Sequence, residues 1–86
     1  MEMGSHLNAL ADTLTDLAPF EPAVIEQAVR GVADAGGLKP GAFMQAVRVS
    51  LTGRTVSPGL FETIELLGRE DSVARIRAGA RQSQSA

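Results

Sequence analysis

The residues with the clearest potential for chemistry lie in the middle of the chain, and their types suit RNA binding. Phe43 marks the inward face of a predicted helix. At about 100° per residue, Gln45, Arg48 and Thr52 fall together on the opposite, outward side of that helix. An outward arginine offers a planar cation, which can stack on an unpaired base or bind a phosphate. This stripe is the first part of a candidate RNA-binding surface.

The second part of the candidate surface follows in the connector after this helix. Arg54 lies in the connector, and Ser57-Pro58 is expected to be the cap and first residue of the next helix. A helix start attracts anions, and Gly59 permits close approach to the backbone. Pro58 and Leu60 add apolar surface, which unpaired bases also require. The plain alternative is an exposed arginine beside an ordinary capped helix.

The sequence contains no recognisable set of catalytic or metal-binding residues. There is no cysteine, and His6 is the single histidine, so neither a Cys/His nucleophile pair nor a zinc site can form. Glu70 and Asp71 are adjacent and do not share a helix face, which makes them favourable at a helix N-terminus instead. No glycine-rich loop followed by lysine is present to hold nucleotide phosphates. We expect no catalysis, no metal and no cofactor in this chain alone.

Charge is unevenly distributed along the chain, whose formal net charge is −2. Residues 1–36 carry six acidic groups and one basic group, a net charge of −5, whereas residues 37–86 carry seven basic and four acidic groups, a net charge of +3. The acidic total speaks against nucleic acid, but the basic second half points to an anionic partner. Chance bias in a small domain explains the asymmetry equally well.

The candidate residues must be positioned by about five short helices. Apolar residues recur at helical spacing, and no segment alternates as a strand would. The expected inward residues are Leu7, Leu10, Ala11, Leu14 and Leu17; Ile25, Ala28, Val29 and Val32; Phe43, Ala46, Val47 and Leu51; Leu60, Phe61, Ile64 and Leu67; and Val73, Ile76 and Ala80. Pro22, Pro40 and Pro58 are expected to begin helices, and Gly36-Gly37 and Gly68 to end them. The sequence therefore predicts an all-α fold.

The chain length of 86 residues allows one small domain. We expect the helical domain to span residues 7–80, with residues 1–6 as a cloning scar and residues 81–86 as a flexible tail. No uninterrupted apolar run approaches the roughly 18 residues of a membrane span, so no membrane partner is expected. We also expect the protein to be cytoplasmic and monomeric.

Three motifs follow one another in the second half of the chain: R-x-x-L-T-G at Arg48–Gly53, S-P-G-L-F-E at Ser57–Glu62 and L-L-G at Leu66–Gly68. Together they closely resemble the C-terminal end of bacterial glutamyl-tRNA synthetases, the glutamate–tRNA ligases. The resemblance runs from about Phe20 to Ala80. In that family this region is the distal half of an α-helical anticodon-binding domain, which holds the first two anticodon bases while the proximal half reads the third. The resemblance implies two partners, the anticodon loop of tRNA(Glu) and the remainder of the synthetase.

The same resemblance implies four direct contacts to anticodon bases. Arg48 matches an arginine that packs against and hydrogen-bonds a base, and Ser57 matches a hydroxyl position beside the base edges. Pro58 and Leu60 match residues whose apolar surfaces support the splayed bases, whereas Phe61 is expected in the core. The supporting residues are Gln45, Thr52, Arg54 and Gly59. ATP and magnesium would belong to the catalytic domain of the parent enzyme.

Three roles are consistent with this sequence. The favoured one is a tRNA anticodon-recognition module of a glutamate–tRNA ligase. The catalytic motifs of that family are not in this chain, which is then either a piece excised from the full enzyme or a natural stand-alone relative. The predicted scar and a tail that ends shortly after the usual terminus of that family favour excision. The alternative is a stand-alone helical protein-interaction module derived from that domain, whose basic half docks an acidic protein. A third is a structural role, in which the module braces the rest of a synthetase.

Overall fold

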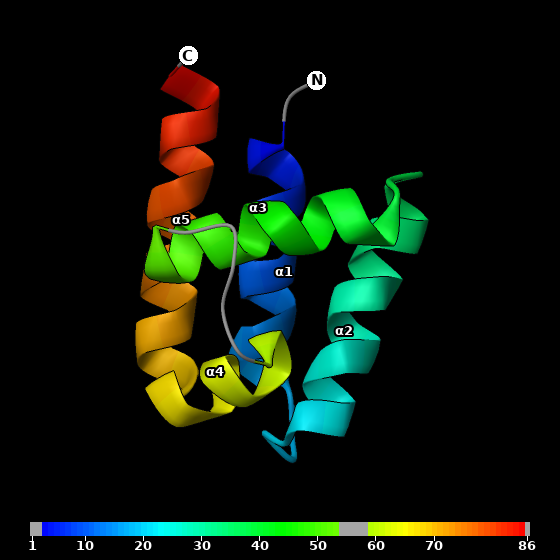
Figure 1. Cartoon of the computed structure of the whole chain (residues 1–86), viewed down its shortest axis with the longest axis vertical. Coiled ribbons are helices and arrows are strands. Elements are labelled where there is room, and N and C mark those ends of the chain that lie inside the picture. Colours follow the sequence, from blue (N-terminus) through cyan, green and yellow to red (C-terminus); the bar gives the residue numbers. More distant parts are fainter. Residues whose placement is uncertain (1–2, 54–58, 86) are drawn as a thin grey trace.

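The computed structural model describes residues 3–53 and 59–85, and these residues form five α-helices without a strand (Figure 1). The helices are α1 (Gly4–Asp16), α2 (Pro22–Ala35), α3 (Pro40–Thr52), α4 (Leu60–Leu67) and α5 (Arg69–Ser85). The all-α fold and the five helices that the apolar spacing predicts are therefore confirmed.

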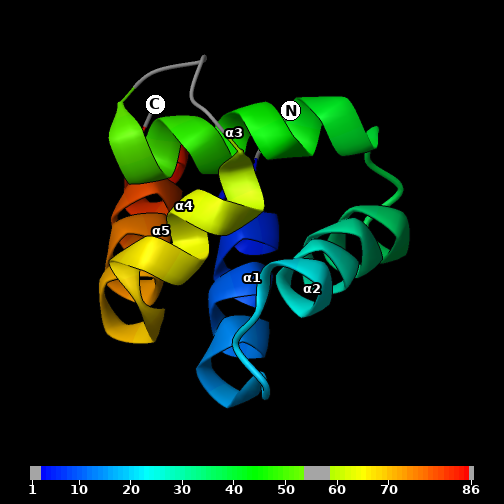
Figure 2. The ribbon, with the colours of Figure 1, turned by 60° about the horizontal axis from the view of Figure 1, so that its bottom comes forward.

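Helix α1 lies at the centre of the arrangement, between α5 on one side and α2 on the other (Figure 1). Helices α1 and α5 run side by side in opposite directions, so the first turn of α1 and the last turns of α5 lie at the same end. Helix α3 runs across them, and the short α4 packs against α2 and α5 nearer the other end (Figure 2). The crossing of α3 over α5 positions three of the candidate residues, Gln45, Arg48 and Thr52.

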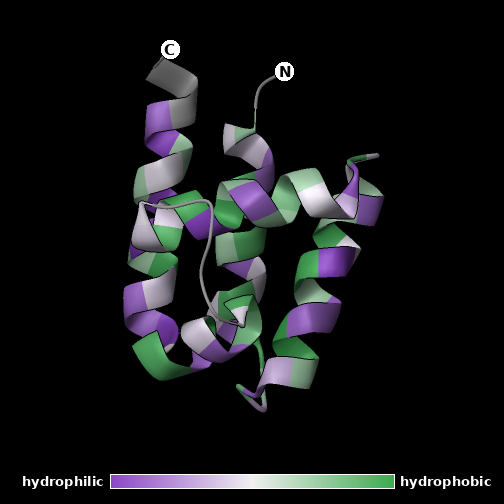
Figure 3. Cartoon of the chain, in the orientation of Figure 1, coloured by the Kyte–Doolittle hydropathy of each residue, from purple (hydrophilic) through white to green (hydrophobic). Residues whose placement is uncertain are grey.

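A single hydrophobic core lies where the five helices meet. Apolar and polar residues alternate around each helix (Figure 3), so that every helix has an apolar face to bury. The buried core residues are Leu7, Leu10, Ala11, Leu14, Ile25, Val29, Ala33, Leu38, Phe43, Val47, Leu51, Leu60, Ile64, Ile76 and Ala80. Phe43 is the largest of them and is fully buried, as predicted. Leu17, Val32, Ala46, Phe61, Leu67 and Val73 pack partly buried around this core.

Proline and glycine set several helix boundaries as the sequence predicts. Pro22 and Pro40 lie in the first turns of α2 and α3, where a missing N–H removes no intrahelical hydrogen bond. Gly68 follows α4 with a φ of 87°, and Gly53 follows α3 with a φ of 73°. Both conformations favour glycine, because a Cβ is strained in the left-handed region.

The start of α4 differs from the prediction. The helix begins at Leu60, with Gly59 as its N-cap, rather than at Ser57-Pro58. Gly59 has φ 15° and ψ 99°, which is not a helical conformation, so the helix cannot extend back through it. Residues 54–58, which include the predicted contacts Ser57 and Pro58, lie outside the described residues.

Two terminal helices extend into segments that the sequence assigns to the ends. Helix α1 begins at Gly4, within the predicted scar of residues 1–6, and α5 continues to Ser85, within the predicted tail of residues 81–86. Extending an existing helix fixes one residue per added hydrogen bond, so polar residues readily continue it. In the described part of the chain, no helix has both the length and the apolarity to cross a membrane, and no His, Asp or Glu cluster there could hold a metal ion.

Candidate nucleic-acid interface

The outward stripe predicted on α3 is present, but its residues differ in exposure. Gln45 and Thr52 are exposed, whereas Arg48 is half-buried. Val49, which lies between them along the helix, is 46% exposed. The stripe faces outward because the opposite face of α3 is buried in the core, where it contributes Phe43, Val47 and Leu51. The last turns of α3 thus present a mixed polar and apolar surface.

Arg48 has an unsatisfied donor. Its Nε is buried and has no hydrogen-bond partner among the described residues. Leaving a buried donor unpaired destabilises a fold by about 1–3 kcal/mol, and such exceptions in a folded protein call for an explanation. Guanidinium carries five N–H donors in a fixed plane. Arg48 therefore holds a partly desolvated planar cation on the outer side of α3.

The C-terminal turn of α3 is closed by side chains as well as by the backbone. The last carbonyl groups of a helix have no intrahelical partners. The hydrogen bonds at this end run from Thr52 Oγ1 to the Arg48 carbonyl oxygen (2.9 Å), from the Gly53 backbone nitrogen to the Val49 carbonyl oxygen (2.8 Å), and from Arg75 Nη1 to the Leu51 carbonyl oxygen (2.8 Å). The backbone beneath the candidate residues is therefore fixed.

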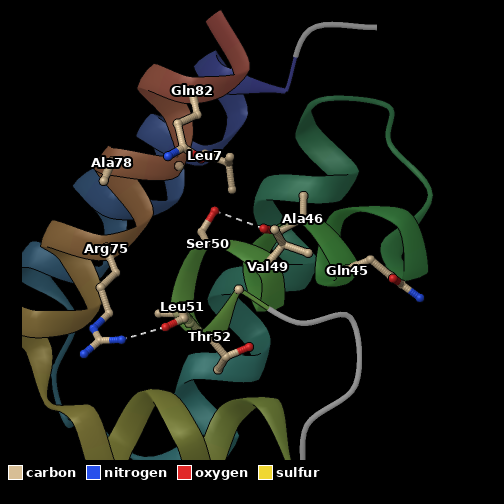
Figure 4. A pocket seen from close by; sticks show the side chains of 12 residues that line it. Leu7, Gln45, Ala46, Val49, Ser50, Leu51, Thr52, Arg75, Ala78 and Gln82 are labelled. Atoms are coloured by element: carbon tan, nitrogen blue, oxygen red, sulfur yellow. Dashed lines mark hydrogen bonds between the residues drawn. The ribbon is translucent and has the colours of Figure 1, made fainter. Parts of the chain in front are cut away.

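A groove of about 740 Å³ runs between α3 and α5 beside this turn (Figure 4). Gln45, Val49 and Thr52 line it from α3, and Arg75 and Gln82 from α5. In Figure 4 Gln45 lies at the far side from α5, and Arg75 reaches across to α3. Polar groups surround apolar side chains in this groove.

Arg48 does not line this groove, although Gln45 and Thr52 do. The structure therefore divides the predicted stripe. Two of its members face the α3–α5 groove, and Arg48 lies beyond the groove, towards the other flank of α3. At 100° per residue the three residues lie within an arc of about 60°, with Arg48 at one edge of it, and the groove beside α5 opens along the other edge only.

The start of α4 already carries a negative charge. A Cβ at Gly59 would lie 2.2 Å from Oε1 of Glu62, so the Glu62 carboxylate occupies the space in front of the helix N-terminus. A carboxylate in the first turn satisfies the positive end of the helix dipole. Glu62 therefore places an internal anion at this helix start, and the attraction of an external anion there stays a prediction.

Leu60 meets only one of its two sequence expectations. Its side chain is 2% exposed and belongs to the core with Ile64. The prediction that it faces inward is confirmed. The implied support of a splayed base is not compatible with this burial, because such contact requires exposed apolar surface. The neighbouring Phe61 is only partly buried. Of the other predicted contacts, Arg54 lies with Ser57 and Pro58 outside the described residues.

Arg69 binds within the chain. Its Nε donates to the Leu14 carbonyl oxygen at 3.1 Å, and its Nη2 donates to the Leu17 carbonyl oxygen. Its guanidinium carbon also lies 5.1 Å from the centre of the Phe20 ring, within the range of a cation–π interaction. Arg69 thus caps the end of α1 and anchors the segment that leads into α2.

Other arginines of the second half are also engaged internally. Arg77 forms an ion pair with Asp12 of α1 (Nη2 to Oδ1, 2.8 Å), and Arg75 binds the Leu51 carbonyl. The net charge of +3 in residues 37–86 therefore overstates the positive charge available to a ligand. Sequence reasoning missed these roles, although a basic residue able to reach the carbonyls of a helix end is a recognised capping arrangement.

Comparison with known proteins places this chain in a family. A family model described as an anticodon binding domain matches residues 2–80. Glutamate–tRNA ligase from Rhodopseudomonas palustris strain HaA2 is 44% identical over 70 residues, which cover 81% of this chain and 15% of that protein. The glutamate–tRNA ligase of Acidothermus cellulolyticus is 45% identical over 80 residues, which cover 92% of this chain and 16% of that protein.

A solved structure agrees with these relatives. The crystal structure of a glutamate tRNA ligase from Elizabethkingia meningosepticum in complex with its amino acid superposes with a TM-score of 0.85 at 26% identity, covering 93% of this chain and 16% of that chain. The chain thus spans about 15% of the length of the curated relatives that it matches. The resemblance seen in the three motifs is confirmed. The chain belongs to the family of anticodon-binding domains, within the group found in glutamate–tRNA ligases.

Proposed function

We propose that this chain is the tRNA-recognition module of a glutamate–tRNA ligase and binds unstacked anticodon bases of tRNA(Glu). Family membership supports an anticodon ligand. The single structural observation that supports the site is Arg48, which is half-buried and has an unpartnered buried Nε in the described part of the chain. RNA recognition in single-stranded loops relies on such planar cations for stacking and hydrogen bonding.

The role of each group follows from its position on α3. Arg48 stacks against one base and donates to its edge, while its stem is held by the packing of α3. Thr52 and Gln45 present polar side chains along the α3–α5 groove, where nucleotides next to that base would lie. Leu60 supports this surface from beneath as part of the core. Ser57, Pro58 and Arg54 remain predicted contacts of the same surface.

The module acts with the rest of the ligase. Binding is its contribution, whereas the chemistry that uses ATP and magnesium belongs to the remainder of the enzyme. We infer that the module binds tRNA(Glu) in the cytoplasm and that the chain is monomeric. Because the module offers few cationic contacts, its affinity for an isolated anticodon arm is weak and decreases with salt.

The test is titration of the chain with an RNA hairpin that carries the anticodon arm of tRNA(Glu), followed by amide chemical shifts. Arg48→Ala is expected to weaken binding by about 1–3 kcal/mol, the usual value of a base stacked on a side chain. Arg30→Ala is the matched control, because Arg30 is an exposed arginine of α2 that pairs with Glu26 of the same helix. It removes the same charge and should change the affinity less than twofold. Equal binding by wild type and Arg48→Ala would refute the assignment of this residue.

Base substitutions in the hairpin separate recognition from general RNA binding. The resemblance implies that this half of the domain holds the first two anticodon bases. Changing either base is therefore expected to weaken binding, whereas changing the third should not. An affinity that is the same for all three hairpins would indicate attraction to phosphates alone and would contradict anticodon recognition.

A further inference from the structure

Arg75 connects the end of α3 to a different helix. Its Nη1 donates to the Leu51 carbonyl oxygen at 2.8 Å, across the groove between α5 and α3 (Figure 4). The carbonyls of a last helical turn lack intrahelical donors, and a cation there is favoured by the helix dipole. Arg75 therefore provides both a donor and a charge at this helix end.

The bond from Arg75 differs from the other hydrogen bonds of this turn. Thr52 and Gly53 bond to carbonyl groups of α3 itself. Those bonds hold the turn together but do not fix it relative to the rest of the molecule. Among the three closing bonds, the one from Arg75 joins the turn to α5. Arg75 therefore adds a hydrogen bond to α5 to the packing that already holds Leu51 in the core.

The turn that Arg75 holds also carries candidate RNA-binding residues. The Arg48 carbonyl accepts the Thr52 hydroxyl within the turn, and Leu51 lies directly before Thr52 with its own side chain buried in the core. Movement of the Leu51 carbonyl therefore moves the backbone of both Arg48 and Thr52. Loss of orientation in a binding side chain weakens binding even where no contact is removed.

We propose that Arg75 is a positioning residue for RNA binding, acting through the Leu51 carbonyl on the α3 turn that bears Arg48 and Thr52. The proposal rests on the proposed function of that surface. Arg75 is not assigned a phosphate contact, because one arm of its guanidinium is committed to the carbonyl. A direct phosphate contact is the competing explanation, and it predicts a different salt dependence.

The chain offers a matched control on the same helix. Arg77 also lies on α5, but it pairs with Asp12 of α1 and makes no bond to α3 in the described residues. Arg75→Ala and Arg77→Ala therefore remove the same charge from neighbouring positions. We expect Arg75→Ala to bind the anticodon hairpin roughly tenfold more weakly, the effect of one charge-assisted hydrogen bond, and Arg77→Ala to bind within twofold of wild type.

Salt titration separates positioning from direct contact. A lost phosphate contact lowers the slope of log affinity against log salt by about 0.7–0.9. Loss of positioning leaves that slope equal to the slope of Arg77→Ala. Arg75→Lys keeps the charge and one donor, so it should recover most of the wild-type affinity. A lower slope in Arg75→Ala, or a lysine variant as weak as the alanine variant while both remain folded, would overturn the proposal.

Hydrogen exchange in the free protein tests the same proposal without RNA. The Gly53 amide, which bonds the Val49 carbonyl at 2.8 Å, should exchange about tenfold faster in Arg75→Ala because the turn opens more often. It should be unchanged in Arg77→Ala. If the wild-type chain bound no anticodon hairpin, the proposed function would fail, whereas this exchange rate would still decide whether Arg75 fixes the α3 turn. Equal protection of Gly53 in both variants would contradict it.

Discussion

Gly79 of α5 and Ser50 of α3 approach so closely that no side chain fits between them. A Cβ at Gly79 would lie 2.0 Å from the Oγ of Ser50, 2.7 Å from its Cβ and 3.3 Å from its Cα. Rotating the hydroxyl would not make room, because the Ser50 Cβ and backbone are also in the way. Helices α3 and α5 therefore cross almost backbone to backbone, beside the groove that Arg75 spans.

Gly79→Ala is expected to destabilise the fold. The added methyl group forces α3 and α5 apart, and overpacking of this kind destabilises by about 1–3 kcal/mol. Alanine improves the helix propensity of α5 by up to about 1 kcal/mol relative to glycine. The net result is a loss on the order of 1 kcal/mol in the free energy of unfolding, measured by urea denaturation.

Gly31→Ala is the control for that experiment, with the opposite sign. Gly31 is an exposed residue within α2, and a Cβ built there meets nothing within 4 Å. The substitution should stabilise the chain by about 0.5–1 kcal/mol through helix propensity and a less flexible unfolded state. If both alanine variants changed stability in the same direction, close packing at Gly79 would not be the determining effect.

Arg69→Met is expected to lower the free energy of unfolding by about 2 kcal/mol, because it removes hydrogen bonds from a charged donor to two carbonyls. The bonds join α5 to Leu14 and Leu17. The stability of Arg69→Lys should lie between that of wild type and that of Arg69→Met. Lysine keeps the charge but lacks the planar guanidinium group that lies over the Phe20 ring. Arg30→Ala, which removes only an exposed pair within one helix, should change stability by less than about 0.5 kcal/mol. A lysine variant as stable as wild type would contradict this role.

Most of the fold could be predicted because it follows from local signals. The inward face of each helix repeats at helical spacing, and Phe43 and Val47 on α3 are buried as that spacing requires. Pro22 and Pro40 mark helix starts, because proline suits a position without an intrahelical N–H bond. Each of these signals lies within a few residues of the structure that it predicts.

The tertiary roles of the arginines could not be predicted in the same way. Arg75, Arg77 and Arg69 bind partners that lie 24, 65 and 55 residues away in sequence. Helical periodicity says which face a residue occupies, but not which distant carbonyl or carboxylate meets it. The net charge of the second half was misleading for this reason, since it counted cations that the fold itself uses.

The candidate site was predictable in composition and only partly in geometry. Arg48, Gln45 and Thr52 do lie on the outer side of α3, yet they face different flanks, because α5 packs along one edge of the stripe. Glu62 was missed as the group that covers Gly59. Its place in the first turn, three residues after the N-cap, matches the glutamate position of a capping box, and this was the available signal.

Leu60→Ala and Leu66→Ala distinguish a core residue from a surface residue on α4. Leu60 is 2% exposed, and Leu66 is 85% exposed. Truncating the buried leucine should destabilise the chain by about 2–5 kcal/mol through lost burial and an unfilled cavity. The exposed leucine should change stability by less than about 0.5 kcal/mol. Urea denaturation measures both values. Similar stability of the two variants would place Leu60 on the surface and restore its assignment as a base contact.

Glu62→Gln tests whether the α4 start is occupied by an internal anion. Removing the carboxylate charge from the first turn should lower stability by about 0.3–1 kcal/mol, because the helix dipole loses its partner. The same change removes a negative charge next to the proposed RNA surface, so binding of the anticodon hairpin should become tighter by about two- to threefold at low salt.

Glu65→Gln supplies the comparison, since Glu65 is an exposed glutamate on the same helix but outside its first turn. It changes the net charge equally and should have a smaller effect on both stability and affinity, because its carboxylate does not lie over Gly59. A gain in affinity confined to low salt would show that Glu62 acts by repulsion at a distance. If instead Glu62→Gln weakened RNA binding, its carboxylate would be accepting hydrogen bonds from the RNA, and the start of α4 would be a base-reading site rather than a capped helix end.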